Sequence, residues 1–230
     1  MEISQAIRTR RSIRSFKPDP VPSKVLEEIL ETSKWAPSAS NTQPWEFAIL
    51  RGKVIEELKT RLIKKTEVGW DISTLKFSNM NPDIPQPELP ELYQQRAIQV
   101  RAHIDAYQFP RGTENLEEKR AGYLLHSARF YGAPNAIILY TERAICPKAI
   151  FDIGIMTQTI ALAALPYELG TCIAGMAVFW PEVLREMLGI PESKLIVTAI
   201  AIGYPNYEAR VNNFTRTREP LDVFAHWHGV

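Results

Sequence analysis

The chain has 230 residues, and its 27 lysines and arginines nearly balance its 26 acidic residues, giving a formal net charge of +1 at pH 7. This length is enough for one sizeable hydrophobic core, so we expect a single domain over residues 1–230. The near-neutral charge disfavours a dedicated nucleic-acid or membrane-surface binder, because such proteins carry a large basic excess.

A basic turn follows the first predicted helix. Apolar residues recur at helical spacing from Ile3 to Ile7. Five cations then fall within ten residues: Arg8, Arg10, Arg11, Arg14 and Lys17. Guanidinium groups are forked, permanently charged donors, so arginines around the hydroxyl of Ser12 suit a phosphate. Taken alone, the stretch is more simply a solvated basic turn, because charge runs usually face water.

A polar loop over residues 36–45 (APSASNTQPW) follows the second predicted helix. That helix has an apolar stripe from Val25 to Leu30 and should end near Trp35, because Pro37 disfavours helical geometry in the residue before it. The serine, asparagine and glutamine side chains of the loop offer donors and acceptors, as a planar heterocycle with an amide edge requires. The alternative is a plain polar connection to a strand over residues 46–50.

The middle of the chain contains a predicted surface excursion at about 70–110. A helical pattern over residues 53–65 dissolves at residue 70, and four prolines then fall between residues 82 and 90. The excursion is long enough to be functional. Its second half, residues 91–107, returns to a helical pattern. Asn115 and Glu118 are spaced as the caps of a further helix, which should run to about Tyr131.

The second half of the chain alternates strands and helices. Strands are predicted over residues 135–141, 171–174 and 195–202, and a helix over residues 181–188. The segment 152–165 is apolar on nearly all sides, so this helix must be buried in the core or against another subunit. The tail, residues 205–230, is polar and irregular and carries Arg210, Arg216 and Arg218.

Helices interleaved with four or five strands indicate an α+β or three-layer fold. The sequence contains no G-x-G-x-x-G after a strand, no P-loop, no G-x-S-x-G and no H-E-x-x-H. Cys146 and Cys172 lack C-x-x-C spacing, so neither a disulfide framework nor a zinc site is indicated and we expect no metal. No uninterrupted apolar run reaches the roughly 18 residues of a membrane span, and no secretory leader follows Met1. We therefore expect a cytoplasmic protein.

Seven short motifs, in this order, resemble the FMN-dependent nitroreductase superfamily. They are RRSIRSF at 10–16, APSASNTQPW at 36–45, GAP at 132–134, DIG at 152–154, ELGTC at 168–172, AIGYP at 201–205 and FTRTREPLD at 214–222. ARFYGAP and NNFTRTREPL are most similar to the subgroup acting on nitrobenzoate-type and other nitroaromatic compounds. The resemblance implies a three-layer α/β/α fold with a central, mostly antiparallel sheet, and a homodimer with FMN at its interface.

The resemblance also implies a set of FMN-binding residues. The phosphate and ribityl chain would be bound by Arg10, Arg11, Ser12 and Arg14. Arg216 and Arg218 of the tail would help to neutralise the phosphate charge. Pro37, Ser38, Asn41 and Gln43 would meet the flavin largely across the dimer interface. Arg129 would place a cation near the pyrimidine edge, although His126 and Ser127 replace an asparagine expected nearby. Glu168, Leu169 and Gly170 would run beside the flavin N5.

The activity implied is a ping-pong reaction in which NADH or NADPH passes hydride to flavin N5 and a nitroaromatic or quinone-like compound then receives the electrons. No catalytic side chain is required, because the cofactor carries the redox chemistry. Alternatives are an FMN-dependent dehalogenase, a flavin-fragmenting relative or a non-catalytic FMN-binding protein. Aromatic residues of the excursion would either roof the pocket or pack against the body: Trp70, Phe77, Tyr93 and Tyr107.

Overall fold

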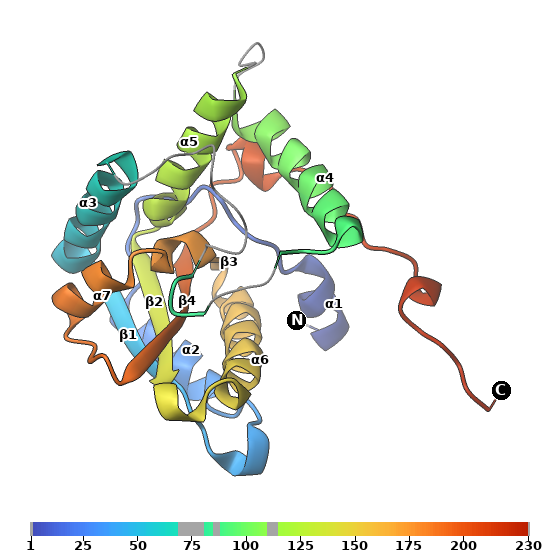
Figure 1. Ribbon diagram of the computed structural model, residues 1–230, viewed down its shortest axis with the longest axis horizontal. Coiled ribbons are helices and arrows are strands. Elements are labelled where there is room, and N and C mark those ends of the chain that lie inside the picture. Colours follow the sequence, from blue (N-terminus) through green and yellow to red (C-terminus); the bar gives the residue numbers. More distant parts are fainter. Residues whose placement is uncertain (1, 69–80, 85–87, 110–114, 230) are drawn as a thin grey trace.

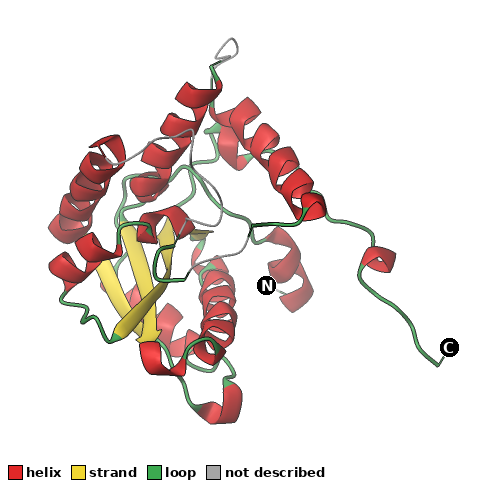
Figure 2. Ribbon diagram, viewed as in Figure 1, coloured by secondary structure: helices red, strands yellow, loops and turns green. Residues whose placement is uncertain are grey.

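Four antiparallel strands form the centre of the protein. The computed structural model describes residues 2–68, 81–84, 88–109 and 115–229. The strands are β1 (Glu46–Arg51), β2 (Asn135–Glu142), β3 (Gly170–Ile173) and β4 (Lys194–Gly203), in the order β1-β2-β4-β3. All three pairings are antiparallel, which confirms the predicted sheet (Figure 2).

Both faces of this sheet are buried, because successive side chains of its central strands point to opposite sides. In β2, Ala136 and Ile138 join one hydrophobic core, whereas Ile137 and Leu139 join the other. Strand β4 alternates in the same way. Two apolar faces require two helical covers, so the sheet is the middle layer of a three-layer fold.

The helices cover the two faces as the predicted architecture requires (Figure 1). One core contains residues of α3 (Gly52–Val68) and α7 (Pro181–Leu188) and the end of α5 (Leu116–Ala128). The other contains residues of α2 (Ser23–Ser33) and α6 (Lys148–Ala163). The predicted α5 is shorter than expected: it ends at Ala128, and Phe130 and Tyr131 take positive φ angles in a 3₁₀ turn.

Helix α6 is apolar enough to resemble a membrane span. By length and composition alone, Lys148–Tyr167 could cross a bilayer. In the structure, one side of α6 packs on α2 and the sheet, where Ile153, Met156 and Ile160 are buried. The described part of the chain does not enclose its other side, where Phe151 is 74% exposed. The sequence-based requirement that this helix be buried on all sides is therefore only half met within one chain.

The remaining helices lie at the edges of the molecule. Helix α1 (Ile3–Thr9) buries no residue, and α4 (Glu91–Gln108), from the predicted excursion, buries Ile104 against the tail. The described tail residues contain only 3₁₀ turns, as expected, and the end of the tail leaves the body (Figure 1). Trp70 and Phe77 lie outside the described residues.

A short segment at residues 81–84 ties the excursion to the sheet. The side-chain amide of Asn81 donates to the carbonyls of Ile196 and Val197, at 3.2 and 3.0 Å. The carboxylate of Asp83 accepts from Arg185 at 2.8 Å and from Arg143 at 3.1 Å. Burial raises the pKa of Asp83, but the bonds from these two guanidinium groups and from the N–H of Ile196 outweigh it and hold the pKa below its usual value.

Candidate functional site

The basic segment, residues 8–17, lies beside the sheet and is joined to it by an isolated bridge. Ser12 forms a parallel bridge with Thr171 of β3, and the N–H of Ile13 donates to the Thr171 carbonyl at 2.9 Å. Four residues later, the N–H of Lys17 donates to the carbonyl of Tyr204, which follows β4. The backbone from Ser12 to Lys17 is therefore fixed between β3 and the start of the tail.

The tail returns to the basic segment, as the sequence predicted. The guanidinium of Arg11 donates to the carbonyl of Phe214. Arg216 donates to the carbonyls of Arg8 and Arg10. These carbonyls belong to the C-terminal end of α1, where a cation is favourable. Arg216 therefore has a structural role in ending α1, besides adding its charge to the cluster.

The arginine cluster (Arg10, Arg11, Arg14, Arg216 and Arg218) lacks compensating acids. Among the described residues no carboxylate forms an ion pair with any of them; Glu219, which follows Arg218 in sequence, pairs with Arg96. Burial, and then the charge of Arg218, lower the pKa of Arg10. Burial and the charges of three neighbouring arginines likewise lower the pKa of Arg216. An anion bound here would relieve this repulsion.

Arg14 is the inward-facing member of the cluster. Its Nε is buried without a hydrogen-bond partner among the described residues, and its guanidinium carbon lies 5.8 Å from the centre of the Phe214 ring. Burial lowers the pKa of Arg14, but Cys172 and two tyrosines outweigh it and raise the pKa above its ordinary value. A buried donor without a partner is costly, which favours a bound acceptor at this position.

Two side chains that the sequence did not single out for this purpose hold the backbone of Arg14. The Asn212 side chain accepts from the Arg14 N–H at 2.7 Å and donates to the carbonyls of Ser15 and Asn206. His126 lies on the other side, with its Nε2 atom 2.6 Å from the Arg14 carbonyl oxygen. Asn212 is 1% exposed, yet nothing in an irregular polar tail marks one asparagine as buried.

The turn after α6 meets the basic segment at Gly170. A Cβ atom there would lie 2.5 Å from Cγ1 of Ile13 and 2.8 Å from Cγ of Pro205, so only glycine fits. Glu168 and Leu169, which precede Gly170, were expected to run beside the flavin N5. The N–H groups of Glu168 and Leu169 already donate to Leu165 and Ala164, at 3.0 and 3.3 Å. Neither of these two N–H groups is therefore free to face a ligand in this conformation.

The polar loop keeps its side chains at the surface. Pro37, Asn41 and Gln43 are exposed, and Ser38 is partly buried, with its hydroxyl accepting from the N–H of Gln43 at 2.9 Å. Ser40, Asn41 and Gln43 take positive φ angles of 55°, 55° and 46°. Such angles are uncommon outside glycine and occur often at ligand sites.

The loop and the arginine cluster lie at opposite ends of α6 in one chain. The N–H of Ala39 contacts the carboxylate of Asp152 near the start of α6, whereas Gly170 follows its end. Figure 1 shows the loop, in light blue, below the start of α6 and far from α1. The helix rises about 17 Å between Asp152 and Ala163. One chain therefore does not bring its predicted flavin residues into one place.

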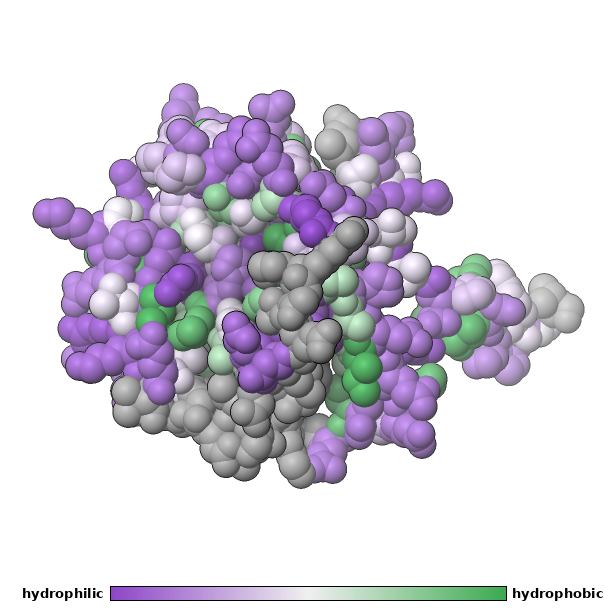
Figure 3. Space-filling view, turned by 90° about the horizontal axis from the view of Figure 1, so that it is seen from above, coloured by the Kyte–Doolittle hydropathy of each residue, from purple (hydrophilic) through white to green (hydrophobic). Residues whose placement is uncertain are grey.

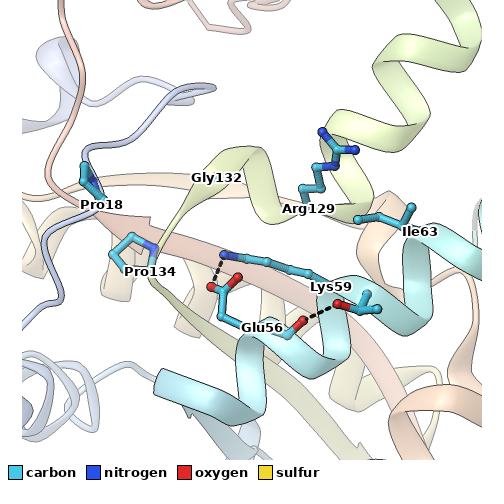
Figure 4. A pocket seen from close by; sticks show the side chains of 8 residues that line it. Pro18, Glu56, Lys59, Ile63, Arg129, Gly132 and Pro134 are labelled. Carbon is cyan, nitrogen blue, oxygen red and sulfur yellow. Dashed lines mark hydrogen bonds and ion pairs between the residues drawn. The ribbon is translucent and has the colours of Figure 1, made fainter.

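Arg129 does not join the other predicted residues. Its exposed side chain lines an open hollow of about 580 Å³ over α3, together with Lys59, Glu56 and Gly132 (Figure 4). In that hollow Lys59 is already paired with Glu56, at 2.7 Å. The turn at Phe130 and Tyr131 follows α5 immediately and leaves Arg129 on the outer surface of the single chain, so its contact with a flavin stays a prediction.

The two described aromatic residues of the excursion differ in environment. The ring centres of Tyr107 and Phe214 are 6.2 Å apart, and the Arg210 guanidinium lies 5.5 Å from the Tyr107 ring. Tyr107 thus packs against the tail, which was the alternative to a roof over the pocket. Tyr93 is 52% exposed and has Arg96 over its ring.

The arrangement of motifs agrees with known proteins. The chain is 28% identical over 222 residues to the chloronitrobenzene nitroreductase of Comamonas testosteroni, covering 96% of this chain and 95% of that protein. It is 29% identical over 226 residues to the nitrobenzene nitroreductase of Ectopseudomonas oleovorans, covering 96% and 95%.

The fold agrees as well. The crystal structure of the FMN-dependent nitroreductase NfnB from Mycobacterium smegmatis, in complex with NADPH, superposes with a TM-score of 0.84 at 26% identity, covering 99% of this chain and 100% of that one. The sequence model of the Nitroreductase family matches residues 7–204. This match includes the basic segment, the polar loop, the central helix and all four strands, and the chain belongs to the nitroreductase family.

Proposed function

We propose that this protein is an FMN-dependent NAD(P)H oxidoreductase that reduces nitroaromatic compounds. The observation that carries the proposal is the uncompensated arginine cluster at the junction of the basic segment, β3 and the tail. In a member of the nitroreductase family, a phosphate-bearing cofactor explains this accumulation of charge.

The residues present fit FMN. Arg10, Arg11 and Arg218 would provide positive charge for the phosphate, and Ser12 a hydroxyl donor or acceptor for the ribityl chain. The buried Nε of Arg14 would gain the acceptor that it lacks among the described residues. When bound, FMN supplies two-electron redox chemistry between the nicotinamide and the second substrate. The side chains of this protein would bind and orient the cofactor and the substrates and exclude water from the site. None is required to act as a nucleophile or an acid.

The substrate class follows from the relatives. The two proteins above are named for the reduction of chloronitrobenzene and nitrobenzene, and the M. smegmatis structure holds NADPH. We infer that nitroaromatic compounds are the electron acceptors of this protein and that NADPH or NADH is the donor. Quinone-like acceptors belong to the same proposal, because a flat oxidised ring would occupy the same site.

The proposed active unit is a homodimer. Among the described residues, helix α6 has an apolar stripe that is incompletely covered: Phe151 is exposed, and Ile155 and Leu162, at helical spacing from it, are only partly buried. Trp35, at the end of α2, is 83% exposed. Pairing two such helices in opposite directions about a two-fold axis would cover both stripes. The same operation would carry Ser38, Asn41 and Gln43 of one chain to the arginine cluster of the other.

The end of the tail supports the same assembly. Leu221, Val223, Phe224 and Trp227 are exposed on a segment that leaves the body. Seen from above, this segment projects to the right and carries hydrophobic surface among polar residues (Figure 3). Exposed apolar residues on a projecting segment are expected where a second subunit covers them.

We further propose that the protein is one cytoplasmic domain without a membrane or nucleic-acid partner. Both cysteines are free, and one side of α6 packs on α2 and the sheet, with Ile153, Met156 and Ile160 buried, as in a helix of a protein core.

The test is a spectrum followed by kinetics. Purified protein should show flavin absorbance bands, either as isolated or after reconstitution with FMN, and NADH or NADPH should bleach them within turnover times. A steady-state screen of nitroaromatics and quinones with both nicotinamides then identifies the acceptors. A protein that binds no FMN after reconstitution would refute the proposal, and one that binds FMN without reduction by either nicotinamide would be a non-catalytic flavin-binding protein.

A further inference from the structure

We propose that His126 is a positioning residue for Arg14, holding its peptide group so that the buried guanidinium faces the bound cofactor. The inference rests on the proposed FMN site. It concerns a residue that stands where the resemblance leads one to expect an asparagine, and its role follows from contacts within this chain.

The first step is the contact itself. His126 lies in the last turn of α5, and its Nε2 atom is 2.6 Å from the carbonyl oxygen of Arg14, which is 112 residues away in sequence. A carbonyl oxygen accepts and never donates, so Nε2 must carry the proton in this contact. The ring meets Tyr131 edge to face, with centroids 5.3 Å apart and planes at 79°. This packing fixes the ring plane, and with it the direction of the N–H bond.

The second step is the charge state of His126. Its burial lowers the pKa of the imidazole, and the positive charges of Arg129 and Arg14 lower it further, whereas the bond to the Arg14 carbonyl raises it; the net shift is downward. The ring therefore acts as a neutral donor near pH 7. A neutral donor fixes the peptide without adding a further cation beside the arginine cluster.

The third step is that the Arg14 backbone is held from both sides. Asn212 accepts from the Arg14 N–H at 2.7 Å, and His126 donates to the Arg14 carbonyl. These two side chains come from the tail and from α5. With both peptide directions fixed, the Arg14 side chain extends into its buried position over Phe214, where its Nε has no hydrogen-bond partner among the described residues. Losing one of the two bonds leaves the Arg14 peptide held from one side only, between the fixed points at Ile13 and Lys17, so the guanidinium shifts from its position.

The experiment measures the FMN dissociation constant by flavin fluorescence for the full chain. His126→Leu should raise this constant roughly three- to tenfold, the worth of one hydrogen bond, and His126→Gln, whose amide can donate from a similar position, should restore most of the affinity. The matched control is His103→Leu. The ring of His103 also contacts a backbone carbonyl, that of Gln99 at 2.8 Å, but on the exposed surface of α4. This control should bind FMN as the unsubstituted protein does.

A double-variant cycle separates positioning from general destabilisation. In an Arg14→Ala background the carbonyl at position 14 remains but the guanidinium is gone. If His126 acts through Arg14, His126→Leu should then change the FMN dissociation constant less than twofold. An equal effect of His126→Leu in both backgrounds, or no effect in either, overturns the inference. Failure of the unsubstituted protein to bind FMN would instead refute the proposed function, so the two failures are distinguishable.

Discussion

The backbone N–H of Ala39 lies 3.3 Å from each carboxylate oxygen of Asp152. Asp152 is the single acidic residue of α6 and is 2% exposed. The contact holds the polar loop against α6, and the side chains of Asn41 and Gln43 in this loop remain exposed on the surface of the chain. It therefore determines where the loop could meet a second subunit.

Replacing Asp152 with Ala should lower the free energy of unfolding by about 1–3 kcal/mol, because the Ala39 N–H loses its acceptor and the loop its anchor. FMN affinity should fall as well, since the loop residues with positive φ would relax. The matched control is Asp152→Asn, which keeps an acceptor oxygen. Urea denaturation at fixed protein concentration and an FMN titration measure both effects. Equal values for the Ala and Asn variants would show that the contact does not hold the loop.

Arg14 and Arg129 should differ sharply in their effect on FMN binding. Arg14→Ala should weaken FMN by about 1.5–3 kcal/mol, the usual worth of a hydrogen bond to a charged group. Arg129→Ala should leave FMN affinity unchanged, because its side chain is exposed over α3. Flavin fluorescence titration of both variants checks this. Weakened FMN binding by the Arg129 variant would support the flavin contact that the resemblance implies, and unchanged binding by the Arg14 variant would show that the basic segment is a solvated turn.

A charge on the uncovered side of α6 should separate the subunits without unfolding them. Phe151→Asp should give the one-chain mass of 26.2 kDa by light scattering and lose FMN, with a native far-UV circular dichroism spectrum. Ile160→Asp, on the same helix, should instead unfold the chain, because Ile160 is fully buried in its own core and a buried unpaired charge is very costly. A flavin-loaded, active sample at one-chain mass would contradict the dimer.

The Asp83 ion pairs should make stability depend on pH in a defined direction. Bonds to Arg185 and Arg143 depress the folded-state pKa of Asp83, so its contribution is complete above the unfolded value of about 3.9 and is lost as pH falls through the lower folded value. Asp83→Asn should cost about 2–3 kcal/mol at pH 7, and this difference should shrink below about pH 4. Urea denaturation of both proteins across that range tests the sign. A difference that grows at acid pH would contradict it.

Much of the fold could be predicted because local signals agreed with the tertiary structure. Helix α7 has the predicted bounds, residues 181–188, since proline begins it and Gly189 ends it with a φ of 66°. The strands around Ile137 and Ile200 were recognisable as apolar runs because both of their faces are covered. The antiparallel character of the sheet came from the family resemblance, whereas the strand order and the bridge between Ser12 and Thr171 were not predicted.

The parts of the site that could not be predicted depend on where the chain turns in space. No periodicity indicates that α5 ends at Ala128 and leaves Arg129 outside. Asn212 becomes important only because the tail returns to Ser15. The need of Asp152 for a polar partner could be recognised in the sequence, because a lone acid in an apolar helix requires one. Its partner, the N–H of Ala39, could not. His126 was noticed as a departure from the family pattern, but its partner, the Arg14 carbonyl, is a backbone atom that no residue type reveals.

The position of the loop and the arginine cluster at opposite ends of α6 has a genetic consequence. If each flavin site draws one half from each subunit, a lesion at Arg14 and a lesion at Asn41 damage different halves of the same site. A mixed dimer of the two damaged chains would then contain one doubly damaged site and one intact site. Two inactive alleles expressed together would complement each other, and random pairing would restore roughly a quarter of the sites.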